Sequence, residues 1–139
     1  MTADQLTSST RFVILPDVAL RLAATEVGIR DEHHLVAPAL LRSQVLALLY
    51  GAVLRGELTR RDAERQLDHL RALRIRLLGD RFLQRHAWTV AEQLGWADTF
   101  DAEYVALTQL QADALVTLDP ELAAAAAGLV TVADIEVLL

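Results

Sequence analysis

The chain has 139 residues, of which 53% are hydrophobic and 23% charged, enough for one domain with an apolar core of its own. It contains no cysteine, which excludes disulfides, thiolate metal sites and a cysteine nucleophile. The formal net charge of −6 argues against a broadly basic surface for nucleic acid, although all 13 basic residues are arginine.

Membrane and export signals are not apparent in the sequence. The longest uninterrupted apolar run, residues 45–54, is shorter than the roughly 18 residues that a membrane-spanning helix needs. The first ten residues are polar and lack the basic start and apolar segment of a secretory leader. We therefore expect a cytoplasmic protein with a loose lead-in at residues 1–10 and a single domain over residues 11–139.

The first predicted strand is the apolar run at residues 12–15, whose continuity is typical of a strand buried on both faces. Asp17 can cap a short helix that follows it, through residue 22. The charged stretch at residues 26–34 predicts a loop or a fraying helix end. A long helix is then expected from Pro38 to residue 54, with Gly56 where it should stop.

The alternation of helices and strands continues in the second half. Thr59 and Asp62 resemble a capping box at the start of a helix with a single apolar stripe, and residues 75–78 suggest a short strand. The later predicted elements are helices opening at Asp80, Asp98 and Asp119, and strands at residues 114–118 and 129–132. This order predicts an α/β fold, a three-layer sandwich whose mostly parallel central sheet of about four to five strands carries helices on both faces.

Three aspartates could converge at one edge of this sheet. Asp17 and Asp119 each follow a predicted strand, and Asp101 lies in the first turn of a predicted helix. Ligands of open parallel sheets bind beyond the carboxyl ends of the strands, and clustered carboxylates suit Mg²⁺ or Mn²⁺ and phosphodiester hydrolysis. The same residue types also make ordinary helix caps, so spacing alone leaves capping and metal binding both open.

Four segments taken together carry a more specific pattern. They are a strand ending in aspartate at residues 12–17, a Pro-containing segment at 37–45, Phe-Asp-Ala-Glu-Tyr-Val-Ala-Leu at 100–107 and Leu-Val-Thr-Leu-Asp-Pro-Glu-Leu at 115–122. In this order they resemble the PIN-domain family and, within it, the toxin ribonucleases of VapBC-type toxin–antitoxin pairs. The likeness covers nearly the whole chain from Phe12 onward.

The resemblance implies a metal-dependent endoribonuclease with a PIN-like fold. Asp17, Asp101 and Asp119 would be ligands of Mg²⁺ or Mn²⁺, directly or through water, and the Thr117 hydroxyl would orient a carboxylate or a water. The metal would activate water for attack on an RNA phosphodiester. Proteins of this kind usually form homodimers and are inhibited by a small antitoxin, which implies RNA, an antitoxin and a second copy as partners.

One departure from the family pattern bears on activity. Gln44 stands where the family carries a glutamate, and a neutral amide replaces a charged carboxylate poorly beside Mg²⁺. Two interpretations follow, an active toxin that works with three aspartates, or a catalytically weakened PIN domain that binds RNA or its antitoxin. A carboxylate from Glu26, Asp31 or Glu32 could substitute if the loop that holds them reached the site.

A cluster of arginines is the candidate surface for RNA phosphates. Arg60, Arg61 and Arg65 lie near a predicted helix start, and guanidinium groups bind phosphate oxygens well. Carboxylates are interspersed among these arginines, so a solvated helix face with internal ion pairs explains them as well.

Overall fold

A single five-stranded sheet forms the centre of the protein. The computed structural model describes residues 10–139, and all neighbouring strands in it run parallel in the order β3-β2-β1-β4-β5. The strands are β1 (Thr10–Ile14), β2 (His33–Pro38), β3 (Arg76–Leu78), β4 (Ala114–Val116) and β5 (Val132–Ala133). The predicted α/β class with a parallel sheet is confirmed.

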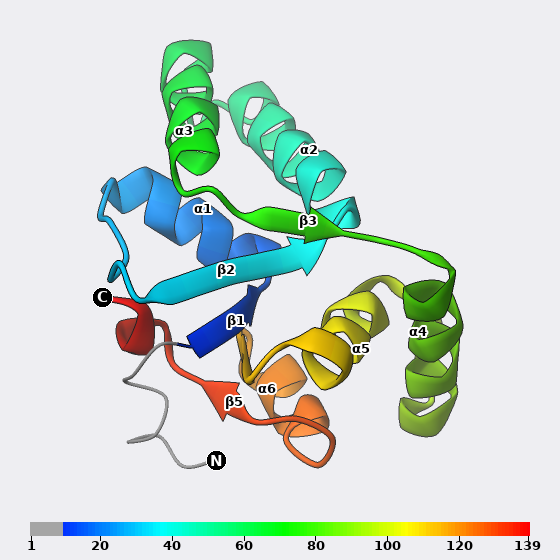
Figure 1. Cartoon of the computed structure of the whole chain (residues 1–139). Coiled ribbons are helices and arrows are strands. Elements are labelled where there is room, and N and C mark those ends of the chain that lie inside the picture. The colour runs from blue at the N-terminus through cyan, green and yellow to red at the C-terminus, as the bar shows by residue number, and fades with distance from the viewer. Residues whose placement is uncertain (1–9) are drawn as a thin grey trace.

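The helices form the two outer layers of the sandwich. One side carries α1 (Pro16–Thr25), α2 (Leu40–Leu54) and α3 (Arg60–Ala72), and the other carries α4 (Arg81–Leu94), α5 (Phe100–Gln111) and α6 (Pro120–Ala126) (Figure 1). The chain runs outward from β1 to β3, then crosses back to β4 and β5. Since parallel crossovers are right-handed, this reversal of direction places the later helices on the opposite face. A short 3-10 helix, η2 (Ile135–Leu138), follows β5.

The core lies on both sides of β1, the middle strand. Phe12, Val13 and Ile14 are completely buried, as are all three residues of β4. Such strands have no solvated face, which explains why their sequences are continuous apolar runs without polar alternation.

The second strand differs from the prediction. Residues 33–38 form β2, where a loop end and the start of a helix were expected, and α2 begins only at Leu40. Two histidines open this strand and disguise its apolar part, which is only three residues long. Pro38 ends the strand, paired with Leu78 of β3, so it does not begin the helix.

Most helix ends follow the predicted chemistry. The Thr59 hydroxyl accepts a hydrogen bond from the Asp62 amide at 3.1 Å, and an Asp80 carboxylate oxygen accepts one from the Leu83 amide at 2.9 Å. Asp17 is an exception, because Leu15 is the N-cap of α1 and Asp17 lies within its first turn. The lead-in predicted for residues 1–10 falls outside the described residues except for Thr10, which belongs to β1.

Candidate functional site

The sheet has one point where neighbouring strands send the chain to opposite faces. After β1 the chain enters α1 on one side, and after the adjacent β4 it enters α6 on the other (Figure 1). Open α/β sheets bind ligands at such a point, beyond the carboxyl ends of the two strands, and we call this place the crevice. Two of the predicted site residues, Asp17 and Asp119, lie at this point.

The Asp17 carboxylate joins the two strand ends. One oxygen, Oδ2, accepts hydrogen bonds from the Thr117 hydroxyl at 3.1 Å and from the Leu118 amide at 3.0 Å. The other oxygen accepts the Val18 amide at 2.7 Å. Asp17 is half-buried and firmly oriented, and each of its oxygens keeps further lone-pair capacity toward a ligand.

Thr117 and Asp119 continue this hydrogen-bonded chain. The Thr117 hydroxyl donates to Asp17 and accepts the Asp119 amide at 3.1 Å. Asp119 caps α6, because its Oδ1 accepts the amides of Glu121 at 2.9 Å and Leu122 at 3.4 Å. Capping and membership of the site, which the sequence left as alternatives, therefore coexist in Asp119.

Asp101 reaches the same neighbourhood from the first turn of α5. Partial burial raises the pKa of its carboxyl group, and repulsion from Asp98, Asp119 and Asp17 raises it further. The three predicted aspartates thus come from segments far apart in the sequence to the same end of the sheet, where they repel one another electrostatically.

Gln44 is connected to this region by Tyr104, a residue that the sequence patterns did not identify as part of the site. The Tyr104 hydroxyl donates a hydrogen bond to the Gln44 side-chain oxygen at 2.5 Å, and Tyr104 itself is fully buried. Burial raises the pKa of the Tyr104 hydroxyl, helped by the negative charges of Glu103, Asp101 and Asp17. Tyr104 follows Asp101 by three residues on α5, a spacing that places both on one helix face and could have identified it.

The aspartates suit a hydrated hard cation better than a closed metal cage. Within residues 10–139, no three His, Asp or Glu side chains stand close enough to hold one ion together. Mg²⁺ usually keeps several waters and takes one or two carboxylates together with substrate phosphates. The oxygen donors of Asp17, Asp101 and Asp119 fit that mode of binding.

The three loop acids do not lie at this crevice, and the arginine cluster does not lie there either. Glu26 ends α1, at the far end of that helix from Asp17, and Asp31 and Glu32 directly precede β2 at the opposite edge of the sheet. The expectation that one of these loop acids could supply a carboxylate to the site in place of Gln44 is therefore wrong for this structure.

The arginine cluster is largely engaged in ion pairs on α3. Arg60 pairs with Glu64 at 3.2 Å, and Arg65 pairs with Asp62 at 3.2 Å and with Glu26 at 3.9 Å. No carboxylate of the described chain pairs with Arg61. The contact with Glu26 places Arg65 near the far end of α1 from Asp17, so the cluster does not border the crevice directly.

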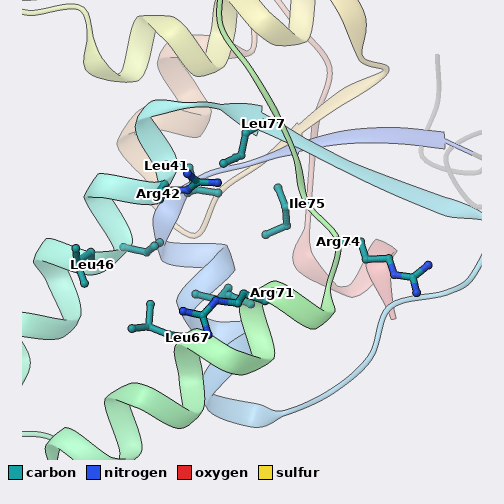
Figure 2. A pocket seen from close by; sticks show the side chains of 10 residues that line it. Leu41, Arg42, Leu46, Leu67, Arg71, Arg74, Ile75 and Leu77 are labelled. Carbon is teal, nitrogen blue, oxygen red and sulfur yellow. The ribbon is translucent and has the colours of Figure 1, made fainter.

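A separate apolar groove runs between α2, α3 and β3. It encloses about 540 Å³ and is lined mainly by leucines, among them Leu41, Leu46 and Leu67 (Figure 2). Arg42 and Arg71 lie among these leucines. Arg71 pairs with Asp68 at 2.6 Å, so the unpaired positive charge at the border of this apolar groove comes, within the described chain, from Arg42 and Arg74.

Comparisons with known proteins establish the architecture. No family model and no curated protein matches the chain. Among solved structures, the chain is similar to PAE2754 from Pyrobaculum aerophilum, with a TM-score of 0.68 and 24% identity over 92% of this chain and 91% of that one. A likeness at this identity shows a shared three-layer α/β fold. None of the helices in residues 10–139 is long and apolar enough to cross a membrane.

Proposed function

We propose that the protein is a metal-dependent endoribonuclease of the PIN type, the toxin component of a VapBC-like toxin–antitoxin pair, acting in the cytoplasm. The observation that carries the proposal is the meeting of Asp17, Asp101 and Asp119 at the crevice between β1 and β4. Helix capping accounts for Asp119 alone, whereas it explains neither the Asp17 bridge nor the repulsion at Asp101.

One or two of the three carboxylates would hold a hydrated Mg²⁺ or Mn²⁺ directly and the rest would act through its waters; the ion, when bound, supplies an activated water and a positive charge opposite the scissile phosphate. Asp17 is kept in place for this by Thr117 and the Leu118 amide. The raised pKa of Asp101 reflects a concentration of negative charge that a cation would relieve. Thr117 acts as a positioning residue, since its hydroxyl orients Asp17.

A second candidate function rests on Gln44. Its oxygen already accepts a hydrogen bond from Tyr104, and an amide brings no negative charge to the crevice. A PIN domain weakened in this way would bind RNA or its antitoxin without cleaving RNA, because loss of one acid/base group removes roughly two to four orders of magnitude in rate.

Cleavage of RNA by the purified protein distinguishes these two functions. End-labelled RNA is incubated with Mg²⁺, with Mn²⁺ and with a chelator, using the native protein, Asp17→Asn and Gln44→Glu. We expect metal-dependent cleavage by the native protein, its loss in Asp17→Asn and an increase in Gln44→Glu. A native protein that is silent beside an active Gln44→Glu supports the binding function.

Silence from all three proteins, each shown to be folded by circular dichroism, would contradict both the nuclease proposal and the weakened-nuclease account. Asp17→Asn serves as the matched control because an asparagine oxygen can still accept the Leu118 amide. Its loss of activity then reports the missing charge and not a lost strand contact.

The partners in this proposal are RNA, a small antitoxin and a second copy of the chain. The apolar groove with Arg42 and Arg74 offers an antitoxin segment a leucine-lined surface that favours acidic residues at its border. A second hollow of about 470 Å³, beside the edge strand β3, is lined by Phe82 and Leu110, which are 77% and 47% exposed. Exposed apolar side chains of this size favour a subunit contact there.

A further inference from the structure

A further cavity, distinct from the apolar groove and from the hollow beside β3, lies at the edge of the sheet opposite the candidate site. It encloses about 690 Å³ between the loop at residues 28–31, the start of β2 and the end of α3. Because parallel strands all start at this edge, the cavity is separated from the aspartates by the length of the central strands. It is therefore independent of the proposed nuclease site.

Six of the thirteen residues that line the cavity are arginine or histidine, although the whole chain carries a net charge of −6. These residues are Arg11, Arg30, Arg74, Arg76, His33 and His34. Asp31 is the carboxylate that lines it, and Glu32 nearby pairs with Arg30 at 2.9 Å. Within the part of the chain that the structure describes, no carboxylate pairs with Arg11, Arg74 or Arg76. Three guanidinium groups thus remain available to an anion.

His33 is a buried polar group that lacks a partner. It is only 4% exposed, it lines the cavity, and neither ring nitrogen has a hydrogen-bond partner in the structure described. Its ring meets Phe12 edge-on, with centroids 5.1 Å apart at 87°. Buried polar groups are nearly always hydrogen-bonded, so this unpaired imidazole is a group that an ordered water or a ligand oxygen can satisfy.

The backbone around the cavity is also open to a ligand. β3 pairs only with residues 36–38 of β2, so residues 33–35 have no strand neighbour on that side within the described chain. Arg74 has a φ of 54°, a left-handed conformation that glycine adopts more readily. Arg74 borders both this cavity and the apolar groove, and Figure 2 shows its guanidinium directed toward the loop that follows α1. A side chain kept in a costly conformation favours a role for that side chain.

We propose that this cavity binds the phosphate group of a small phosphorylated ligand of about nucleotide size. One guanidinium group can donate two parallel hydrogen bonds to two phosphate oxygens. Three arginines without an ion pair in the described chain match the charge of a phosphate dianion better than that of a ligand with a single carboxylate. The volume falls within the roughly 300–1,000 Å³ of small-molecule sites. His33 supplies a hydrogen bond at the buried end, and the arginines offset the partial negative charge at the end of α3.

Calorimetric titration with inorganic phosphate and with adenosine monophosphate, at constant ionic strength, tests this site. We expect saturable binding of both, tighter for the nucleotide. Arg74→Gly removes the guanidinium and relieves the backbone, and Arg76→Gln removes a second charge. Each should weaken binding by about tenfold or more, since hydrogen bonds between charged groups are lost.

Two further variants separate the site from fold and from overall charge. His33→Phe keeps an aromatic ring against Phe12 but carries no nitrogen, so the folded protein should bind phosphate more weakly. Arg85→Gln, on α4 and without an ion pair in the described chain, makes the same change of charge away from the cavity and should bind as the native protein does.

The absence of saturable phosphate and nucleotide binding would overturn the proposal, as would equal binding by Arg74→Gly and by the native protein. A single-stranded RNA that binds through Arg74 and Arg76 while adenosine monophosphate does not would also overturn it, because the phosphate would then come from a nucleic acid. These outcomes do not depend on RNA cleavage, so they stand apart from the test of the nuclease.

Discussion

The pKa of Asp101 shows the effect of the negative charge at the crevice. Burial and three neighbouring carboxylates raise its pKa from the ordinary value of 3.8, so the folded protein holds this proton more tightly than the unfolded chain does. Its contribution to stability therefore falls as pH rises from the ordinary aspartate value through the raised one. At neutral pH the ionised Asp101 destabilises the fold.

Asp101→Asn should raise the free energy of unfolding at pH 7 by no more than about 1 kcal/mol, because Asp101 loses only part of its hydration and solvent at its exposed surface screens the repulsion. At a pH below 3.8 the two proteins should be equally stable, because the native carboxyl group is then protonated in both states. Urea denaturation at both pH values checks this. A variant that is less stable at pH 7 would show that Asp101 is held by attractive contacts.

The Thr117 hydroxyl gives a second prediction at this scale. Thr117→Val keeps the shape of the side chain but removes the donor to Asp17 and the acceptor for the Asp119 amide. The free energy of unfolding should fall by about 1–3 kcal/mol, since partly buried groups lose their partners. Thr117→Ser, which keeps the hydroxyl, should lose less in the same denaturation experiment. A larger loss in Thr117→Ser than in Thr117→Val would assign the effect to the γ-methyl group.

The sequence located individual site residues better than their contacts. Asp17 and Asp119 were placed at strand ends from hydrophobic runs, Thr117 was added by the family resemblance, and the structure joins the three by hydrogen bonds. The pairing of Tyr104 with Gln44 was not predicted, because it joins two helices 60 residues apart. No local pattern encodes such a contact, which depends on how α2 and α5 pack over the sheet edge.

At the scale of elements, α6 combines a helix cap with a predicted ligand. Asp119→Asn keeps an oxygen for the Glu121 and Leu122 amides, whereas Asp119→Ala removes it. We expect Asp119→Ala to lose about 1 kcal/mol of unfolding free energy and Asp119→Asn to lose much less. Both should lose metal-dependent RNA cleavage. Thermal denaturation measures the effect of losing the helix cap, and the cleavage assay measures the effect of losing the charge. Cleavage retained by Asp119→Asn would show that the reaction does not require the charge of this residue.

The elements most accurately predicted are those with chemical markers at their ends. Asp80 begins α4 and Gly95, with a φ of 68°, ends it, as side-chain capping and left-handed glycine require. β2 was missed because a short buried strand and a piece of helix share one apolar pattern, and Pro38 reads equally as a helix start. The pairing of these residues with β1 and β3, which are distant in sequence, makes them a strand and not a helix.

At the scale of the whole molecule, a cation at the crevice should stabilise the fold. Binding to the folded state alone raises the free energy of unfolding with the logarithm of the ligand excess over Kd, by about 2.7 kcal/mol at a hundredfold excess, and the melting temperature rises with it. We expect Mn²⁺ to raise the melting temperature of the native protein and to have little effect on Asp17→Asn. A rise of equal size in both would place the cation elsewhere.

The proposed dimer is a property of the whole molecule as well. Phe82 and Trp88 are both exposed on α4, but only Phe82 lines the hollow beside β3. Phe82→Glu should convert a dimer to a monomer in light scattering after gel filtration, whereas Trp88→Glu should not. A native protein that is monomeric at all concentrations would remove this contact from the proposal.

The bridge from Asp17 to the Leu118 amide spans 101 positions of the chain and crosses the boundary between the two halves of the sheet. That amide proton is therefore protected from exchange with solvent only while β1 and β4 stay docked at their carboxyl ends. Its hydrogen-exchange rate measures how often the crevice opens, without any substrate or metal. A cation or RNA that closes the crevice would slow this one exchange rate before any change in global stability became visible.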